Sequence, residues 1–159
     1  MNEIPKDIRR ELRIGNYVNS IIKTTDNKDI KILSKVECLH RNVAELSDGI
    51  NTFTAAYVTN IEAIPLTEEI LLSFGFMKKD ENGRYGYIYF KSHNDYNYVV
   101  ERDFNKYPSH FFGIEYTDSP NPEDDYKPEH FSFDMKYVHQ LQNMWFALTG
   151  EELISKFKL

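Results

Sequence analysis

The feature of this chain that most constrains its fold is an amphipathic pattern over residues 137–153. Apolar side chains recur there at the three-and-four spacing of one helical face, so the pattern predicts a helix that packs against a core. The face consists of Val138, Leu141, Trp145 and Leu148, and Tyr137 and Met144 broaden it. We expect this helix to close the fold by covering a sheet of aromatic side chains.

The opposite side of the predicted helix carries a polar strip with one aromatic side chain. An amphipathic helix normally shows such a strip as solvated surface, and a contact surface for a partner is the alternative interpretation. The strip consists of His139, Gln142, Asn143 and Phe146. We take these four residues as the candidate interaction surface, which could equally close a symmetric dimer.

Two overlapping signals mark the end of this helix. Gly150 suits the left-handed residue that follows a helix. Thr149 and Glu152 have the spacing of a capping box, which would open a short second helix. The apolar residues of that second helix would be Leu153, Ile154 and Phe157. Because the two signals share residues, we expect a tight helix-turn-helix corner.

Length and composition limit the class of protein. The 159 residues are enough for one domain or for two small subdomains that share a core. Cys38 is the only cysteine, which excludes an internal disulfide and a metal site made of cysteines alone. The first residues lack the apolar stretch of a signal peptide, and no apolar run approaches the ~18 residues that span a bilayer. We therefore expect a cytoplasmic protein without a membrane segment.

The net charge of −6 arises in the second half of the chain. Residues 1–64 hold nine Lys/Arg and nine Asp/Glu, whereas residues 65–159 hold ten Lys/Arg against sixteen Asp/Glu. Part of the excess lies in the proline-rich stretch 117–129, whose composition fits neither a helix nor a sheet interior. We interpret this stretch as an exposed acidic loop, with docking of a basic partner as the alternative.

Residues 1–64 show the alternation and the turn signals of about five short strands. The predicted strands cover residues 15–23, 30–38, 42–46, 53–58 and 61–64. Five strands in about fifty residues are too few for a sandwich and fit a small, partly open barrel of the SH3-like kind. Ahead of them, Ile4, Ile8 and Leu12 at spacing four predict a short helix or a partly ordered arm over residues 1–13.

Residues 65–159 begin with a predicted two-turn helix. Thr67 is a good N-cap residue, and Glu68 and Glu69 suit the start of a helix. Gly75 can end it. Alternating aromatic residues then predict strands over 85–90, 96–100, 111–116 and 131–133, the last leading into the long helix. The predicted fold class is α+β: an SH3-like β-barrel subdomain with an N-terminal arm over residues 1–64, then an antiparallel sheet packed with helices over residues 65–159.

Nucleic-acid or nucleotide binding is one alternative function. Exposed aromatic side chains on a sheet can stack bases, and phosphates need neutralising cations. The residues that would serve are Tyr85, Tyr87 and Tyr89 on one sheet face, and Arg9, Arg10, Arg13, Lys31, Lys35 and Arg41 in the first half. The negative charge of the second half argues against this alternative, and strand tyrosines are more often half-buried packing residues.

Enzyme signatures such as a glycine-rich phosphate loop or a Gly-x-Ser-x-Gly elbow do not occur in the sequence. We therefore predict no catalytic residue and no cofactor. A metal-dependent hydrolase is a weaker alternative: if the segments around them pair as neighbouring strands, His110 and His130 could meet near Glu115 or Asp134. Cys38 and His40 would share a strand face, but the sequence indicates no third group that would support a nucleophile.

Three stretches carry a recognisable combination of motifs. They are residues 12–18 (LRIGNYV), residues 64–76 (IPLTEEILLSFGF) and residues 137–153 (YVHQLQN through LTGEEL). In order and spacing they resemble an uncharacterised family found in gut anaerobes, their phages and mobile elements. The resemblance spans nearly the whole chain and implies no activity; through the family's phage association it implies an accessory or host-interaction role. A shorter connection usually precedes the last helix in that family, so residues 104–133 look like an elaboration.

The function we expect is that of a non-enzymatic binding or interaction protein of phage or mobile-element type. The expected partner is an unknown protein, bound through the barrel or through the polar strip of the last helix, and a homo-oligomer is the alternative. Nucleic acid is disfavoured by charge, and no membrane association is expected.

Overall fold

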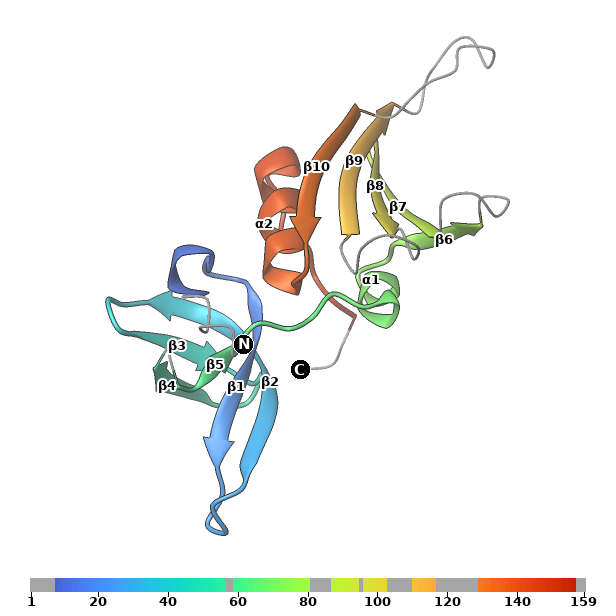
Figure 1. The fold of residues 1–159 in the computed structure, drawn as a ribbon. Coiled ribbons are helices and arrows are strands. Elements are labelled where there is room, and N and C mark those ends of the chain that lie inside the picture. Colours follow the sequence, from blue (N-terminus) through green and yellow to red (C-terminus); the bar gives the residue numbers. More distant parts are fainter. Residues whose placement is uncertain are drawn as a thin grey trace, which may run out of the picture. The chain divides into compact units, whose positions relative to one another are not determined.

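The computed structural model of the chain describes residues 8–56, 59–80, 87–94, 96–102, 110–116 and 129–156. These residues form two compact units. The first unit takes in the described residues up to Pro65 together with Tyr137–Leu153, and the second takes in Leu66–Lys136 and Ile154–Lys156. In the described residues each unit is built on one antiparallel sheet of five strands with few helices, so the fold is mostly β (Figure 1).

The sheet of the first unit is curled into a half-barrel. Its strands are β1 (Tyr17–Lys23), β2 (Asp29–Leu39), β3 (Val43–Ser47), β4 (Thr52–Ala56) and β5 (Ile61–Glu62), in the order β4-β3-β2-β1-β5. The five strands expected in residues 1–64 are thus confirmed. β1 and β2 pair from Tyr17 and Lys35 to Lys23 and Asp29, and they extend beyond the other strands as a two-stranded ribbon (Figure 1).

The curled sheet encloses an apolar core because its strands alternate inward and outward side chains. Val18, Val36, Ala44 and Leu46 are fully buried there. The other members are Ile8, Leu12, Ala55 and Ile61, with Leu39, Phe53 and Ala63 packed against them. Ile8 begins a short 3-10 helix, η1 (Ile8–Arg10), so the segment ahead of β1 packs on the core. Residues 1–7, for which a helix or an arm was predicted, lie outside the described residues.

An irregularity in β2 changes which of its side chains face the core. Val36 pairs with Leu46 but Cys38 pairs with Glu45, so β2 has one extra residue between these two pairs. As a result Val36 and Leu39, three residues apart, both contact the core. Cys38, next to Leu39, therefore occupies a position on the outer face of the sheet.

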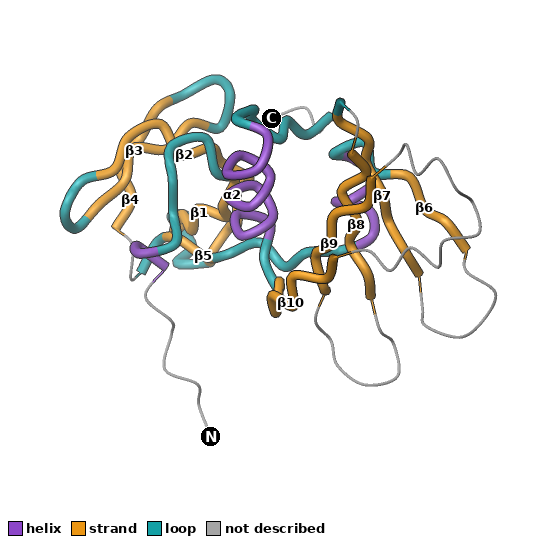
Figure 2. The backbone as a smooth tube through the Cα atoms, turned by 90° about the horizontal axis from the view of Figure 1, so that it is seen from above, coloured by secondary structure: helices purple, strands orange, loops and turns teal. Residues whose placement is uncertain are grey.

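The C-terminal helix α2 (Val138–Thr149) belongs to the first unit and lies beside β1 (Figure 2). Val138, Leu141 and Trp145 are buried, as the apolar stripe predicts. Leu148 is 39% exposed, so the buried stripe stops before the last turn of the helix. The grouping of α2 with the half-barrel differs from our expectation that it covers the aromatic sheet of the second half.

Helix α2 ends at Gly150, which has the expected left-handed conformation with φ 73°. The second helix predicted beyond it is wrong, because residues 151–156 are not helical. The Thr149 hydroxyl donates back to the Trp145 carbonyl at 2.8 Å. The Glu152 carboxylate accepts hydrogen bonds from Arg13 instead of capping a new helix. Thr149 Oγ1 also accepts from the Glu151 N–H at 3.1 Å, but the Glu152 side chain does not complete the expected capping box.

The second unit begins with helix α1 (Glu68–Ser73) and continues as an antiparallel meander. Its strands are β6 (Met77–Asp80), β7 (Tyr87–His93), β8 (Tyr96–Arg102), β9 (His110–Tyr116) and β10 (Glu129–Met135), in the order β10-β9-β8-β7-β6. Four of them overlap the four predicted strands. β6 was not predicted, because its short and mostly charged sequence shows no apolar alternation.

Helix α1 has the predicted ends. Thr67 Oγ1 accepts from a backbone N–H of the first turn at 3.4 Å, and Gly75 takes φ 82°. Lys91 on β7 donates its Nζ–H to the Phe74 carbonyl at 2.8 Å, which places a cation at the negative end of the helix. Burial lowers the pKa of Lys91, and repulsion from Lys156 lowers it further.

Residues Leu66–Lys136 of the second unit lie between β5 and α2 in the chain, and Ile154–Lys156, after α2, complete that unit. Its two connections are paired: Pro65 and Tyr137 form an isolated antiparallel bridge, with backbone hydrogen bonds of 2.8 and 2.9 Å on its two sides. The first unit runs to Pro65 and resumes at Tyr137, so α2, expected in the part 65–159, lies in the first unit. Residues 117–128 of the expected acidic loop 117–129 lie outside the described residues.

Candidate functional site

Two residues of the polar strip of α2, His139 and Gln142, are buried, and the strip contacts the segment that leads into β1. Gln142 is fully buried; its Oε1 accepts from the Tyr17 N–H at 2.8 Å. Its Nε2 donates to the Gly15 and Leu153 carbonyls at 3.3 and 3.4 Å. A primary amide offers one acceptor oxygen and two donor hydrogens. Gln142 therefore both accepts and donates hydrogen bonds. Its partners are backbone groups of two separate segments, one ahead of β1 and one after α2.

Asn143 and His139 extend this contact. Asn143 Nδ2 donates to the Glu11 carbonyl at 2.6 Å, and its Oδ1 accepts from Asn16 Nδ2 at 3.0 Å. His139 is 1% exposed, with its Nε2 3.2 Å from Glu11 Oε2 and its ring stacked on Tyr137. These side chains meet backbone and carboxylate groups of the same chain. For His139, Gln142 and Asn143 the interpretation as solvated or partner-binding surface is corrected accordingly, because these three side chains form an internal contact.

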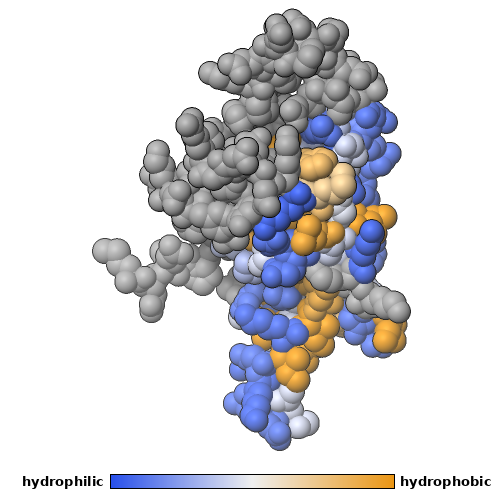
Figure 3. Space-filling view, turned by 90° about the vertical axis from the view of Figure 1, so that its right-hand side faces the viewer, coloured by the Kyte–Doolittle hydropathy of each residue, from blue (hydrophilic) through white to orange (hydrophobic). Residues whose placement is uncertain are grey.

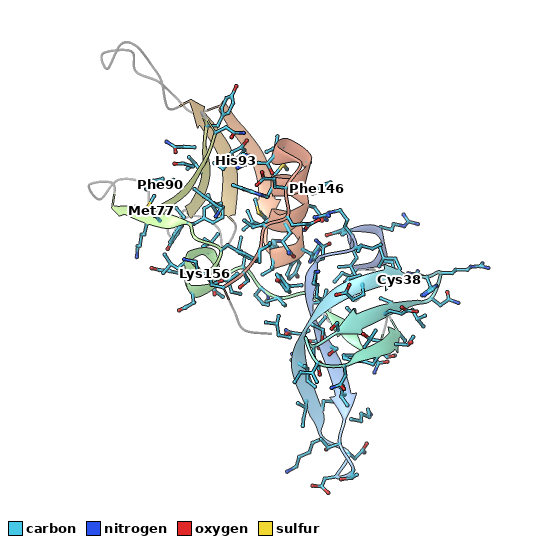
Figure 4. All side chains as sticks on the ribbon, turned by 180° about the vertical axis from the view of Figure 1, so that it is seen from behind. Cys38, Met77, Phe90, His93, Phe146 and Lys156 are labelled. Atoms are coloured by element: carbon cyan, nitrogen blue, oxygen red, sulfur yellow. The ribbon has the colours of Figure 1, made fainter. Side chains whose placement is uncertain are left out.

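Phe146, labelled in Figure 4, is the most exposed member of the strip, and 38% of it is accessible to solvent. The guanidinium carbon of Arg13 lies 4.0 Å from the centroid of its ring. Arg13 also donates to both carboxylate oxygens of Glu152, at 2.6 and 3.0 Å. The pKa of Glu152 lies below its ordinary value of 4.5, mainly because of these hydrogen bonds. Arg13 thus ties the segment ahead of β1 to the residues that follow α2.

Carboxylate partners are seen for Arg13, Lys31 and Lys35 among the cations considered for phosphate binding. The pairs are Arg13–Glu152, Lys31–Glu62 and Lys35–Glu37. Arg9, Arg10 and Arg41 are exposed. Tyr89 is fully buried, so it cannot stack a base; Tyr85 and the side chain of Tyr87 lie outside the described part of the structure. Among the described residues, the proposed platform and its cations are therefore weakened as a nucleic-acid site.

The alternative metal site of His110, His130 and Glu115 requires that the two histidine segments pair as strands. β9 and β10 do pair. The register sets His130 opposite Gly113 and His110 opposite Met135, however, so the two histidines are not cross-strand neighbours. The side chains of these residues lie outside the described part of the structure. The backbone register gives this site no support.

Two isoleucines are exposed on the ribbon formed by β1 and β2. Ile22 and Ile30 are directly opposite each other in the register and are 39% and 48% exposed. Val18, Ser20 and Ile22 share one face of β1, and Val18 is fully buried in the core. The core-facing side of the sheet therefore continues past the core as an exposed apolar pair. Figure 3 shows hydrophobic residues along this ribbon and hydrophilic residues at its end.

Three potential ligand side chains gather at the hairpin of β2 and β3. Cys38 is directly opposite Glu45, and the hairpin closes through a hydrogen bond from the His40 N–H to the Val43 carbonyl at 2.9 Å. His40 Nε2 lies 3.2 Å from Glu45 Oε1, and one ligand atom of each of the three residues lies within 4.8 Å of the other two. Cys38, labelled in Figure 4, is half-buried, and the other two side chains are about half exposed. Such a set can hold a metal ion, and a thiol beside an imidazole is also the pairing of a nucleophile with a base.

Glu45 is the member of this cluster that the spacing of residue types does not reveal. Cys38 and His40 stand two apart in the sequence, whereas Glu45 comes from the next strand. A two-residue loop at Arg41 and Asn42 between the predicted second and third strands would have set Cys38 opposite Glu45. Glu45 could therefore have been predicted only from the register of the hairpin, which sets it opposite Cys38.

Comparison with known proteins finds no matching family model, no matching curated protein and no matching solved structure. Within the described ranges, no helix is both long enough and apolar enough to cross a membrane.

Proposed function

We propose that this protein is a non-enzymatic binding protein, and that its half-barrel, of the SH3-like kind, binds a protein partner through the β1–β2 ribbon. The observation that supports this proposal is the exposed cross-strand pair Ile22 and Ile30. Adjacent apolar side chains that continue a core face into solvent are typical of an interaction site. A partner that covers them removes from water the apolar surface that the fold leaves open.

The charges around this pair favour a protein partner over a nucleic acid. The end of the ribbon carries both signs, on Lys23, Asp26, Lys28, Asp29 and Lys31. Binding of phosphates needs concentrated positive charge, whereas a protein interface has an apolar centre and a polar rim. The ribbon has the second pattern, because two isoleucines are bordered by charges of mixed sign.

The backbone of the ribbon offers a second kind of contact. β3 pairs with β2 only from Lys35 onward, so β2 between Asp29 and Ser34 has β1 on one side and no described strand on the other. An extended segment of a partner can add to such an edge through main-chain hydrogen bonds. The ribbon thus combines an apolar face with an edge that can accept a strand.

The test compares partner capture by three tagged forms of the full-length protein: wild type, the double variant Ile22→Lys/Ile30→Lys, and the control Ile50→Lys. Ile50 is 89% exposed in the turn between β3 and β4, so the control makes the same change away from the ribbon. We expect one host protein to be retained by wild type and control and to be reduced at least about tenfold by the double variant, because central interface side chains carry most of the binding energy. Equal retention by all three forms would contradict the proposal.

The proposed setting is the cytoplasm, in an accessory or host-interaction role of phage or mobile-element type, because three stretches of the sequence resemble such a family. A second copy of this chain is also a protein partner; concentration-dependent sedimentation that the double variant abolishes would identify it. Salt-dependent binding of RNA or single-stranded DNA, unchanged in the double variant, would instead support the nucleic-acid alternative.

A further inference from the structure

We propose that the β2–β3 hairpin binds one zinc-class divalent ion through Cys38 Sγ, a ring nitrogen of His40 and the carboxylate of Glu45. One ligand atom of each lies within 4.8 Å of the other two, and His40 Nε2 is already 3.2 Å from Glu45 Oε1. Around a tetrahedral ion with bonds of ~2.0–2.3 Å, two ligand atoms lie ~3.5 Å apart. The three atoms have to approach by only about 1 Å, which rotation of half-exposed side chains can supply.

The types of ligand select the ion. Magnesium and calcium take oxygen ligands, so a thiolate and an imidazole disfavour both. Sulfur, nitrogen and oxygen donors in one site fit zinc, for which cobalt(II) is a spectroscopic substitute. Three protein ligands leave a fourth position for water or for an atom of a partner. This site stands on the outer face of the sheet, whereas the isoleucine pair stands on the core-facing side, so the inference does not depend on the function proposed above.

The fold arranges the three ligands before an ion arrives. Cys38 and Glu45 form a cross-strand pair, whose Cβ atoms in an antiparallel sheet lie ~4.5–5.5 Å apart on one face. The bulge after Val36 turns Cys38 to the outer face, and the hydrogen bond from the His40 N–H to Val43 fixes the end of the hairpin. Ligands held by a sheet lose little conformational freedom when they bind.

The test adds Co²⁺ or Zn²⁺ alone to the metal-stripped full-length protein. We expect one equivalent of Co²⁺ to bind with thiolate-to-cobalt charge-transfer absorption and with the visible bands of a tetrahedral site, and Zn²⁺ to displace it. Zn²⁺ should raise the melting temperature, because only the folded chain brings the three ligands together.

Substitution of each proposed ligand tests whether that residue binds the ion. Cys38→Ser, His40→Asn and Glu45→Gln should each weaken binding of Zn²⁺ at least about tenfold, since even the loss of an outer-shell partner costs ~10–100-fold. Glu37→Gln is the matched control, because Glu37 is an exposed carboxylate of the same strand that pairs with Lys35. Undiminished binding of Zn²⁺ by all three ligand variants would overturn the proposal, as would Co²⁺ binding without a thiolate band.

One further measurement needs no variant. Cys38 is the only thiol in the chain, so the rate at which iodoacetamide alkylates the protein reports on this side chain alone. A thiolate bound to zinc is shielded from the reagent, so one equivalent of Zn²⁺ should slow the reaction at least about tenfold. An alkylation rate that Zn²⁺ leaves unchanged would show that Cys38 is not a ligand.

Discussion

At the scale of the residue, the first unit depends on amide side chains that are hidden from water. Replacement of Gln142 by leucine keeps the size of the side chain but removes the partner of the Tyr17 N–H and of the Gly15 carbonyl. A buried polar group left without its partner costs ~1–3 kcal/mol. We therefore expect Gln142→Leu to lower the free energy of unfolding by about 2–5 kcal/mol. Urea titration followed by the fluorescence of Trp145, the only tryptophan and buried on the same helix, measures the change.

Leu148→Ala is the control for this prediction. Leu148 lies on the same helix but is 39% exposed, so the loss of part of its side chain should change the free energy of unfolding by no more than about 0.5 kcal/mol. If Gln142→Leu proved as stable as this control, Gln142 would not be the link between α2 and the segment ahead of β1.

The ion pair of Arg13 and Glu152 predicts a small acid sensitivity. Because hydrogen bonds from Arg13 depress the pKa of Glu152 in the folded chain, their stabilisation is present above pH 4.5 and is lost as the pH falls through the folded-state pKa. Glu152 is 42% exposed, so solvent screens the pair and its contribution at neutral pH is about 0.5 kcal/mol. We expect Glu152→Gln to be less stable than wild type by that amount at neutral pH and equally stable well below pH 4.5. Urea titrations at both pH values test this, and a difference that does not change with pH would contradict it.

At the scale of the element, local patterns determine which segments are helices and strands but not what each of them packs against. The strands of the half-barrel pair with neighbours in sequence, so alternation and turn residues suffice to predict them. The apolar stripe likewise predicts α2, but its partner is decided by Gln142 and Asn143, whose side chains find backbone groups more than a hundred residues away. A polar strip looks the same in sequence whether water or another segment satisfies it.

The candidate sites depend on the register of the strands in the same way. Ile22 and Ile30 are ordinary strand residues in sequence, and only the length of the ribbon beyond the core leaves them exposed. Cys38 and Glu45 become neighbours through the hairpin, and the bulge in β2 decides which face they share. Such irregularities leave no fixed mark in the spacing of residue types, because one extra residue reverses every later side chain.

At the scale of the whole molecule, the chain leaves the first unit after β5 and returns to it with α2. The bridge between Pro65 and Tyr137 sets the outgoing and the returning chain side by side. The half-barrel, its covering helix and both proposed binding features therefore belong to one unit that is interrupted by the other. We conclude that α2 completes the half-barrel even though residues 66–136 separate the two in sequence.

The most direct measurement of that claim uses a chain in which residues 66–136 are replaced by Asn-Gly. Directly opposed residues of antiparallel strands have Cα atoms ~4.5–5.5 Å apart, so a two-residue turn can join Pro65 to Tyr137. The fluorescence of Trp145 is followed through a urea titration of this shortened chain. We predict the emission of a buried indole and one cooperative transition. The emission of a water-exposed indole without a transition would contradict the claim that α2 belongs to the half-barrel.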